Sequence, residues 1–196
     1  MAKLIEMRGS SNMVTGLQKL CLGTKNLLGE REDLNIVEIG CYCGHSTLII
    51  NSCFINATIN CVDPWAMYRE EGSTYDLDNQ AEELREAEEV FDANIKSHSN
   101  IKKNKMASIE FAAAVQNESL DLVYIDGDHS YAAVKQDILT WMPKVKVGGV
   151  IAGHDVSCAA VCKALSEIFS CNPDGAFEDD SWAYIKTQQM KDSFGE

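Results

Sequence analysis

Apolar residues along the chain fall into short continuous runs that alternate with longer stretches of helical periodicity. The runs are rich in Ile, Val and Leu, and Pro64 ends the second of them because proline cannot continue a strand ladder. Continuous apolar runs of this kind are typical of strands buried on both faces of a sheet. We expect the fifth run to be opened by the glycine pair 148–149. The runs that predict strands are 35–39, 57–63, 100–106, 120–126, 147–155 and 181–186.

Between these runs, apolar residues recur at spacings of three and four, which predicts amphipathic helices. In the charged stretch 69–94, residues such as Leu84 and Phe91 form one apolar face, and the acidic residues lie on the solvated face. Ser108 and Ser130 are expected to act as helix N-caps. The expected helices are one or two within 13–28, and then 45–54, 69–94, 108–115, 130–142 and 159–169.

Strands and helices that alternate in this way predict an α/β fold, with a mostly parallel sheet covered by helices on both faces. The 196 residues and the hydrophobic content of 45% suit one domain with a sizeable core. No internal repeat, low-complexity tract or linker divides the sequence. We therefore expect a single domain over 1–196, with a short helical segment at about 10–30.

The formal net charge of −13 disfavours binding to nucleic-acid phosphates and to anionic membrane surfaces. The N-terminal residues lack the apolar core of a signal peptide, and no apolar run approaches the length of a membrane span. We therefore expect a cytoplasmic protein without nucleic-acid or membrane partners. In that compartment most of the eight cysteines are expected to be reduced.

Polar and small residues follow the predicted strands, where packing of a core would not require them. In open parallel sheets, ligands bind in the crevice outside the carboxyl ends of the strands. The sequence therefore predicts a binding site along this edge. The strand-end residues that would form it are Glu38, Gly40, Asp63, Asp126, His129, His154 and Asp155.

The first strand end indicates the class of ligand. The segment "VEIGCYCGHST" has an acid before Gly40 and a second glycine, Gly44, four positions later. A dinucleotide-binding turn would need a middle glycine where this chain has Tyr42. The pattern E-x-G-x-x-x-G instead resembles the first motif of the class I S-adenosylmethionine-dependent methyltransferases.

This resemblance implies a Rossmann-like, doubly wound and mostly parallel sheet of about seven strands, with an antiparallel C-terminal strand and helices on both faces. It also implies that the glycine turn wraps S-adenosyl-L-methionine, that Glu38 helps to fix the cofactor's ammonium group and that Asp63 holds the ribose hydroxyls. A carboxylate suits the last role because it can accept two hydrogen bonds from a diol. The cofactor-binding residues implied are Glu38, Gly40, Tyr42, Gly44, Ser46, Asp63, Ser108 and Asp126.

Each of these positions also has a purely structural interpretation. Glu38 could cap a nearby helix N-terminus, and Gly40 and Gly44 could form a tight turn and nothing more. Asp63, just before Pro64, could be an ordinary turn residue. Their occurrence together on successive strand ends favours the ligand site.

The stretch from about 35 to 186 resembles more specifically the branch with I-D-G-x-H-x-Y and G-G-x-I-x-G-H-D segments, which includes the macrolide-sugar O-methyltransferases. In those relatives a divalent metal, usually magnesium, binds the substrate oxygens beside the methyl group. The likeness implies Asp126 and Asp155 as metal ligands and His129 as the general base. A cation lowers the pKa of a coordinated hydroxyl, and an imidazole can then accept its proton near neutral pH. Alternatively, Asp128 caps the following helix and His129 is a surface residue.

The chain departs from this branch at the end of the fifth strand, where the sugar-modifying relatives have two adjacent acids and this chain has His154 and Asp155. The third protein ligand is then either His154 or replaced by water. Imidazole ligation would shift the preference from magnesium towards manganese or iron.

The sequence predicts a metal-assisted O-methyltransferase that acts on a small-molecule hydroxyl, such as a sugar or an aromatic diol. Two alternatives stay open, namely a metal-independent N- or protein methyltransferase and a member that binds the cofactor without catalysis. Residues 64–80 could lie over the site as a lid, with aromatic residues such as Trp65 and Tyr75 for the acceptor. A homo-oligomeric assembly stays open as well.

Overall fold

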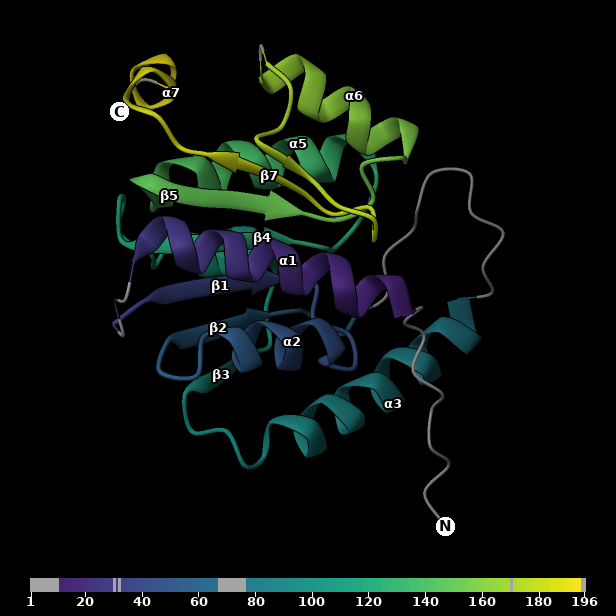
Figure 1. Ribbon diagram of the computed structural model, residues 1–196. Coiled ribbons are helices and arrows are strands. Elements are labelled where there is room, and N and C mark those ends of the chain that lie inside the picture. Colours follow the sequence, from purple (N-terminus) through teal and green to yellow (C-terminus); the bar gives the residue numbers. More distant parts are fainter. Residues whose placement is uncertain (1–10, 30, 32, 67–76, 170, 195–196) are drawn as a thin grey trace.

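The computed structural model describes residues 11–29, 31, 33–66, 77–169 and 171–194. All of its strands belong to one sheet, with the order β3-β2-β1-β4-β5-β7-β6 (Figure 1). The strands are β1 (Asn35–Ile39), β2 (Thr58–Val62), β3 (Ile101–Asn104), β4 (Leu120–Ile125), β5 (Val145–Gly153), β6 (Gly175–Ala176) and β7 (Trp182–Ile185).

The pairing of the strands confirms the predicted α/β architecture. The first five strands pair in parallel, while β7 runs antiparallel to both β5 and β6. Strand order reverses between β1 and β4, and the carboxyl ends of these central strands meet at one edge of the sheet. This is the place where an open doubly wound sheet forms a ligand crevice.

Helices cover both faces of the sheet (Figure 1). Core residues of α1, α2 and α3 pack on one face, and those of α4, α5 and α6 pack on the other. Because side chains alternate along a strand, Ile36 of β1 enters the first core and its neighbour Val37 enters the second. The helices are α1 (Ser11–Leu28), α2 (His45–Cys53), α3 (Leu77–Ile95), α4 (Ser108–Ala112), α5 (Tyr131–Trp141), a 3₁₀ turn (Met142–Lys144), α6 (Ala159–Ile168) and α7 (Gln188–Ser193).

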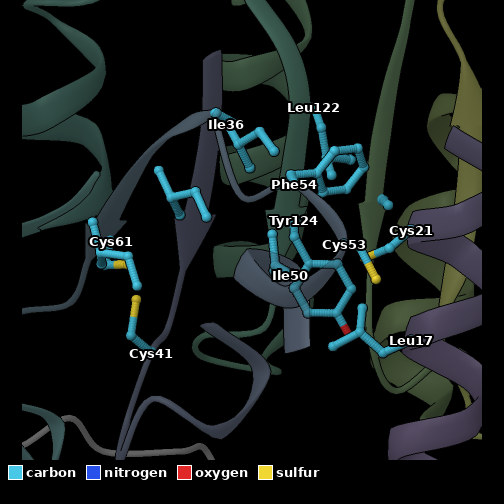
Figure 2. Packing of buried hydrophobic residues seen from close by; sticks show 14 of the residues in the cluster. Leu17, Cys21, Ile36, Cys41, Ile50, Cys53, Phe54, Cys61, Leu122 and Tyr124 are labelled. Atoms are coloured by element: carbon cyan, nitrogen blue, oxygen red, sulfur yellow. The ribbon is translucent and has the colours of Figure 1, made fainter. Parts of the chain in front are cut away.

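Figure 2 shows the first of these cores, where α1 and α2 meet the sheet. Leu17 of α1 and Ile50 of α2 are fully buried beside Leu122 and Tyr124 of β4. The aliphatic side chains and the Tyr124 ring fill the space between helices and strands, so α1 is an integral layer of the fold. The segment that predicted one or two helices is therefore a single helix.

Two details of the predicted elements are wrong. The glycine pair lies inside β5 and does not open it, because Val145 already pairs with Leu120 of β4 and the backbone of Lys186 hydrogen-bonds to Gly148 and Gly149. The N-cap of α4 is Ala107 and not Ser108, whose side chain bonds elsewhere. The N-cap prediction for Ser130 is confirmed, since its side chain accepts a hydrogen bond from the backbone of Ala133.

The short elements β6 and α7 were not predicted from the sequence, because two and six residues are too few to establish a periodicity. The helix expected in 69–94 begins at Leu77 and ends at Ile95, and residues 67–76 lie outside the described part of the chain. Among the described helices, none is long and apolar enough to cross a membrane.

Candidate functional site

A cavity of about 500 Å³ opens at the carboxyl ends of β1, β2 and β4. The turn after β1, the residues after β2 and β4, and the nearby parts of α3, α4 and α5 line it. Eight residues were implied by the resemblance to bind the cofactor, and six of them line this cavity. Those that line it are Gly40, Tyr42, Ser46, Asp63, Ser108 and Asp126, whereas Glu38 and Gly44 do not.

The turn from Gly40 to Gly44 has a backbone that requires its two glycines. Gly40 has a φ of 78°, and a Cβ there would lie 2.0 Å from the carbonyl oxygen of Asp126. Gly44 has a φ of 81°, and a Cβ there would lie 2.9 Å from the ring of Phe91. Only glycine combines this backbone conformation with so close an approach. The turn thus packs tightly against the β4 end and leaves the cavity open above it.

Asp63 organises this turn from the end of β2. Its Oδ2 accepts hydrogen bonds from the backbone N–H groups of Cys41 at 2.9 Å and Tyr42 at 3.0 Å, and its Oδ1 accepts one from Trp65 at 2.7 Å. A carboxylate can accept about four hydrogen bonds. One position therefore remains for a hydroxyl of a ligand in the cavity.

Glu38 lies behind the turn and is fully buried. Its carboxyl group accepts hydrogen bonds from the hydroxyls of Ser46 and Thr47 in the first turn of α2. Burial raises the pKa of Glu38 to about 7, although these hydroxyls oppose the shift. Glu38 thus joins β1 to α2 through side-chain hydroxyls and does not act as the helix N-cap, which is Gly44.

Ser108, the first residue of α4, lines the cavity from the face of the sheet opposite to α2. Its Oγ donates to Oδ1 of Asp137 and accepts a hydrogen bond of 2.8 Å from Nε1 of Trp141. Burial raises the pKa of Asp137 to about 6. The sequence reasoning missed Asp137, although an acid within the apolar stripe formed by Val134, Ile138 and Trp141 was a signal for it.

Trp65 does not belong to the acceptor site that its loop position suggested. Its side chain is buried, and its ring packs at a tilt of 54° against the ring of Phe91, with the centroids 4.9 Å apart. Its Nε1 donates a hydrogen bond to the carbonyl oxygen of Tyr42. The indole therefore supports the glycine turn from below. The other aromatic residue named for the acceptor, Tyr75, lies outside the described residues.

Two acids and two histidines converge beside the cavity, at the ends of β4 and β5. Nε2 of His129 lies 2.9 Å from Oδ2 of Asp155 and 3.6 Å from Oδ1 of Asp126. Nδ1 of His154 lies 3.2 Å from Asp155 and 3.8 Å from Asp126. The structure thus brings together all four residues proposed for metal binding and proton transfer.

The electrostatics of this cluster favour charged imidazoles. Hydrogen bonds with Asp126 and Asp155 raise the pKa of His129 to about 10. Burial lowers the pKa of His154, but its contacts with Asp155 and Asp126 outweigh this and raise it to about 9. The two imidazoles in turn hold the pKa of Asp155 well below its usual range.

Backbone geometry fixes the positions of these side chains. Asp155 has a φ of 59°, and the carbonyl oxygen of His154 accepts a hydrogen bond of 3.0 Å from Nε1 of Trp182 in β7. Asp128 accepts a hydrogen bond from the backbone of Ser130 and leads into α5. The side chain of His129 faces both acids, so it is not simply a surface residue.

The donor set fits a divalent cation. One ligand atom each of Asp126, His154 and Asp155 lies within 4.8 Å of the others, and all three residues are partly exposed. Two carboxylates and an imidazole suit manganese or iron as well as magnesium. Binding would require His154 to lose its proton, so it would be pH-dependent.

Comparison with known proteins identifies the family. A family model described as a methyltransferase domain matches residues 37–156, which include the turn, Asp63 and both histidines of the cluster. The chain is a class I S-adenosylmethionine-dependent methyltransferase.

Solved structures share the fold of this methyltransferase at low sequence identity. A Corynebacterium glutamicum protein has a TM-score of 0.58 and is 19% identical, with 87% of this chain and 78% of that chain covered. A Staphylococcus aureus protein assigned as a caffeoyl-CoA O-methyltransferase has a TM-score of 0.58 and is 14% identical, over 85% of this chain and 80% of that chain.

A third similar structure is CalS11, a TDP-rhamnose 3'-O-methyltransferase of calicheamicin biosynthesis. It has a TM-score of 0.58 and is 13% identical, over 90% of this chain and 80% of that chain. A search of curated proteins found no match. The structural likenesses therefore establish the fold, and the family model establishes the methyltransferase.

Proposed function

We propose that this methyltransferase transfers the methyl group of S-adenosyl-L-methionine to a hydroxyl of a small molecule, with a divalent metal at Asp126, His154 and Asp155. The observation that carries the proposal is the convergence of these three ligand atoms within 4.8 Å, beside a fourth polar side chain, His129. An acidic pair held this close is costly unless cations or protons compensate it.

The residues of the chain would divide the work between binding and proton transfer. When bound, the cofactor supplies an electrophilic methyl group, and the cation lowers the pKa of a hydroxyl that it coordinates. Asp63 and the turn would hold the cofactor end of the cavity, while Asp126 belongs both to the cavity lining and to the cluster. Positioning of acceptor and donor in this way supplies much of the acceleration of a methyl transfer.

His129 is the residue proposed to accept the proton of the acceptor, at Nε2. In the absence of a cation, the two carboxylates hold its pKa at about 10, so the ring is protonated at neutral pH. A cation on Asp126 and Asp155 cancels much of that attraction. The pKa of His129 would then fall towards its ordinary range, where an imidazole acts as a base.

An acceptor of the sugar or aromatic diol class is favoured by the names of two structural neighbours, one a TDP-rhamnose O-methyltransferase and the other assigned as a caffeoyl-CoA O-methyltransferase. A vicinal diol can also use both of its oxygens on one cation. We propose that the protein works in the cytoplasm on such small molecules, without nucleic-acid or membrane partners, and a homo-oligomer stays open.

A metal-independent methyltransferase, acting on nitrogen or on a protein side chain, is the second candidate. The observation that favours it is the ion pair between His129 and Asp155, which satisfies the cluster without a cation. A member that binds the cofactor without catalysis would show the same ion pair and no turnover.

The test is calorimetric titration of S-adenosylhomocysteine and, separately, of Mn²⁺ and Mg²⁺, into the protein with and without EDTA. We expect micromolar binding of S-adenosylhomocysteine and measurable cation binding that is lost in Asp126→Asn and Asp155→Asn. Asp92→Asn, on the exposed side of α3, is the matched control and should bind the cation as the wild type does.

The outcomes separate the candidates. Cation binding that survives both substitutions would refute the proposed metal site. S-adenosylhomocysteine binding without any cation binding would move the assignment to the metal-independent methyltransferase, and methylation of a diol by a His129→Ala variant at the wild-type rate would refute the role of the base.

A further inference from the structure

Four cysteines form two thiol pairs on the same face of the sheet. Cys21 of α1 lies next to Cys53 at the end of α2, and Cys41 of the glycine turn lies next to Cys61 of β2 (Figure 2). All four are free thiols. In each pair one thiol shifts the pKa of the other. The two pairs nevertheless lie in very different surroundings.

The Cys21–Cys53 pair lies near the edge of the core, next to a cation. Nζ of Lys25, one turn beyond Cys21, donates a hydrogen bond of 3.1 Å to the backbone carbonyl of Cys53. Cys53 is 8% exposed, and Oγ of Ser52 lies 3.9 Å from its sulfur. The Cys53 sulfur is therefore buried just below the surface, with one thiol, one hydroxyl and one ammonium group close by.

The Cys41–Cys61 pair is enclosed. The exposed fraction is 2% for Cys41 and 0% for Cys61. The thiol of Cys41 donates to the backbone carbonyls of Glu38 and Val62, and burial raises its pKa well above the usual range. The enclosed position of both sulfurs makes this pair an internal comparison for the other.

The charge balance around Cys53 favours its thiolate. The hydrogen bond from Cys21 lowers the pKa of Cys53 to about 6, against the effect of burial, and Lys25 adds a smaller contribution. The acids that face the pair from other elements, Glu38 of β1 and Asp179 before β7, act on Cys21 and help to raise its pKa. Cys53 is thus the nucleophile, and Cys21 keeps its proton.

We propose that Cys53 and Cys21 are a peroxide-reactive pair, which hydrogen peroxide or a small organic hydroperoxide converts into an intramolecular disulfide between α2 and α1. The assignment stands on the paired thiols, the position of Cys53 at the edge of the core and the ammonium group of Lys25 beside it. It is independent of the metal and of the methyl acceptor.

The chemistry is balanced by the peroxide. The Cys53 thiolate attacks one peroxide oxygen, the O–O bond breaks, and hydroxide leaves as Cys53 becomes a sulfenic acid. The sulfur of Cys21 then attacks the sulfur of Cys53, the S–O bond breaks, and the proton of the Cys21 thiol leaves with the hydroxyl as water. Two thiols are oxidised to one disulfide, and one peroxide is reduced to two waters.

The disulfide would join two helices that otherwise only pack together. α2 begins at His45, directly after the turn that lines the cavity, and Gly44 is its N-cap. A bond at the other end of this helix would fasten it to α1. Oxidation would therefore restrict an element that carries one wall of the cofactor site.

The test treats the full chain at pH 7 with a small excess of hydrogen peroxide, followed by alkylation of the remaining thiols and mass spectrometry. We use a background in which the exposed Cys162 and Cys171 are serine. The expected product has lost two hydrogen atoms and contains a Cys21–Cys53 link. Chymotryptic cleavage after Tyr42, Leu48 and Phe54 separates Cys53 from the other cysteines of the segment.

Variants give each step its own readout. Cys21→Ser should stop at a sulfenic acid on Cys53 that dimedone traps, and Lys25→Met should slow oxidation on the order of three-fold through loss of charge. Cys61→Ser is the matched control and should form the Cys21–Cys53 link at the wild-type rate.

A link between Cys41 and Cys61, or full alkylation of Cys21 and Cys53 after peroxide treatment and unfolding, would overturn the proposal. Trapping of the sulfenic acid on Cys21 would also overturn the assigned nucleophile. The mapping of the otherwise unsubstituted background chain decides the question even if a serine variant fails to fold.

Discussion

Glu38 shows at the scale of one residue how the site depends on an unusual protonation state. Its carboxyl group is fully buried, and its pKa is raised from 4.5 to about 7. A carboxyl group with a raised folded-state pKa favours folding when it is protonated. Stability is thus complete below pH 4.5 and declines as the pH rises from 4.5 to about 7, because the unfolded chain ionises first.

We predict that Glu38→Gln removes most of this decline, which amounts to about 3 kcal/mol for a shift of this size. Urea unfolding at pH 5, 6 and 7 measures the change in the free energy of unfolding. Glu86→Gln, an exposed acid on α3, is the control and should keep the wild-type slope. A steeper decline with pH in Glu38→Gln than in the wild type would contradict the prediction.

Asp63 holds the turn through both of its carboxylate oxygens, which accept hydrogen bonds from backbone N–H groups. In Asp63→Asn an amide NH₂ must face at least one of these donors. We predict a loss of about 2–3 kcal/mol in the free energy of unfolding and weaker binding of S-adenosylhomocysteine, by about ten-fold or more.

Urea unfolding and calorimetry measure these two effects separately. Asp92→Asn, which removes an exposed ion pair with Lys103, should cost less than about 1 kcal/mol and leave the affinity unchanged. Wild-type stability of Asp63→Asn would show that the carboxylate does not hold the turn.

The sequence indicated the individual site residues better than it indicated their partners. Asp126, His129, His154 and Asp155 were proposed from strand ends, and the structure brings them together. The hydrogen bonds from Ser46 and Thr47 to Glu38 could not be predicted, because hydroxyl donors in the following helix have no recognisable sequence pattern.

At the scale of elements, strands were predicted well where both faces are buried. Every residue of β4 is buried, and all of them except Asp121 are apolar or aromatic, so the bounds of the strand are clear. The start of β5 was not predictable in this way, because Gly148 and Gly149 belong to it only through their bonds to Lys186, far along the chain. The N-cap of α4 was wrong for a similar reason, since the partners of Ser108 lie in α5.

The turn between β1 and α2 gives a prediction at this scale. Gly40→Ala combines a left-handed backbone with a Cβ 2.0 Å from the carbonyl oxygen of Asp126, so β1 and β4 must separate locally. Gly148 has a similar φ of 84° and nothing within 4 Å of an added Cβ. Gly148→Ala therefore isolates the backbone cost of about 1–2 kcal/mol.

We predict that Gly40→Ala lowers the free energy of unfolding by at least about 2 kcal/mol more than Gly148→Ala. Urea unfolding of the two variants side by side measures the difference. Equal losses would mean that the turn can move away from β4 at little cost.

At the scale of the whole molecule, the net charge of −13 acts on the cofactor before contact. S-adenosylmethionine carries one more positive charge than S-adenosylhomocysteine, because its sulfur is a sulfonium. Attraction at long range speeds association and is screened by salt.

We predict that the association rate of S-adenosylmethionine falls about three-fold between low and high salt, while that of the uncharged product changes much less. Stopped-flow measurement of tryptophan fluorescence can follow both ligands, since Trp65 supports the glycine turn. An equal salt dependence for the two ligands would contradict steering by net charge.

The overall architecture was predictable because strands and helices alternate along the whole chain, and the family resemblance added the antiparallel last strand. The neighbours of that strand were not predictable, because β6 has two residues and lies beside it at the edge of the sheet. A single domain over 1–196 stays a prediction, although the described strands all belong to one sheet.

The place of β7 between β5 and β6 has a consequence for synthesis on the ribosome. A nascent chain that ends before Trp182 can pair β1 to β5, but one side of β5 then has no partner strand. Unpaired strand edges can pair with other chains, so we expect such an intermediate to need chaperones to avoid aggregation. Nε1 of Trp182 also donates a hydrogen bond to the carbonyl oxygen of His154. Addition of β7 therefore both covers the edge of β5 and fixes a backbone group of the histidine–carboxylate cluster.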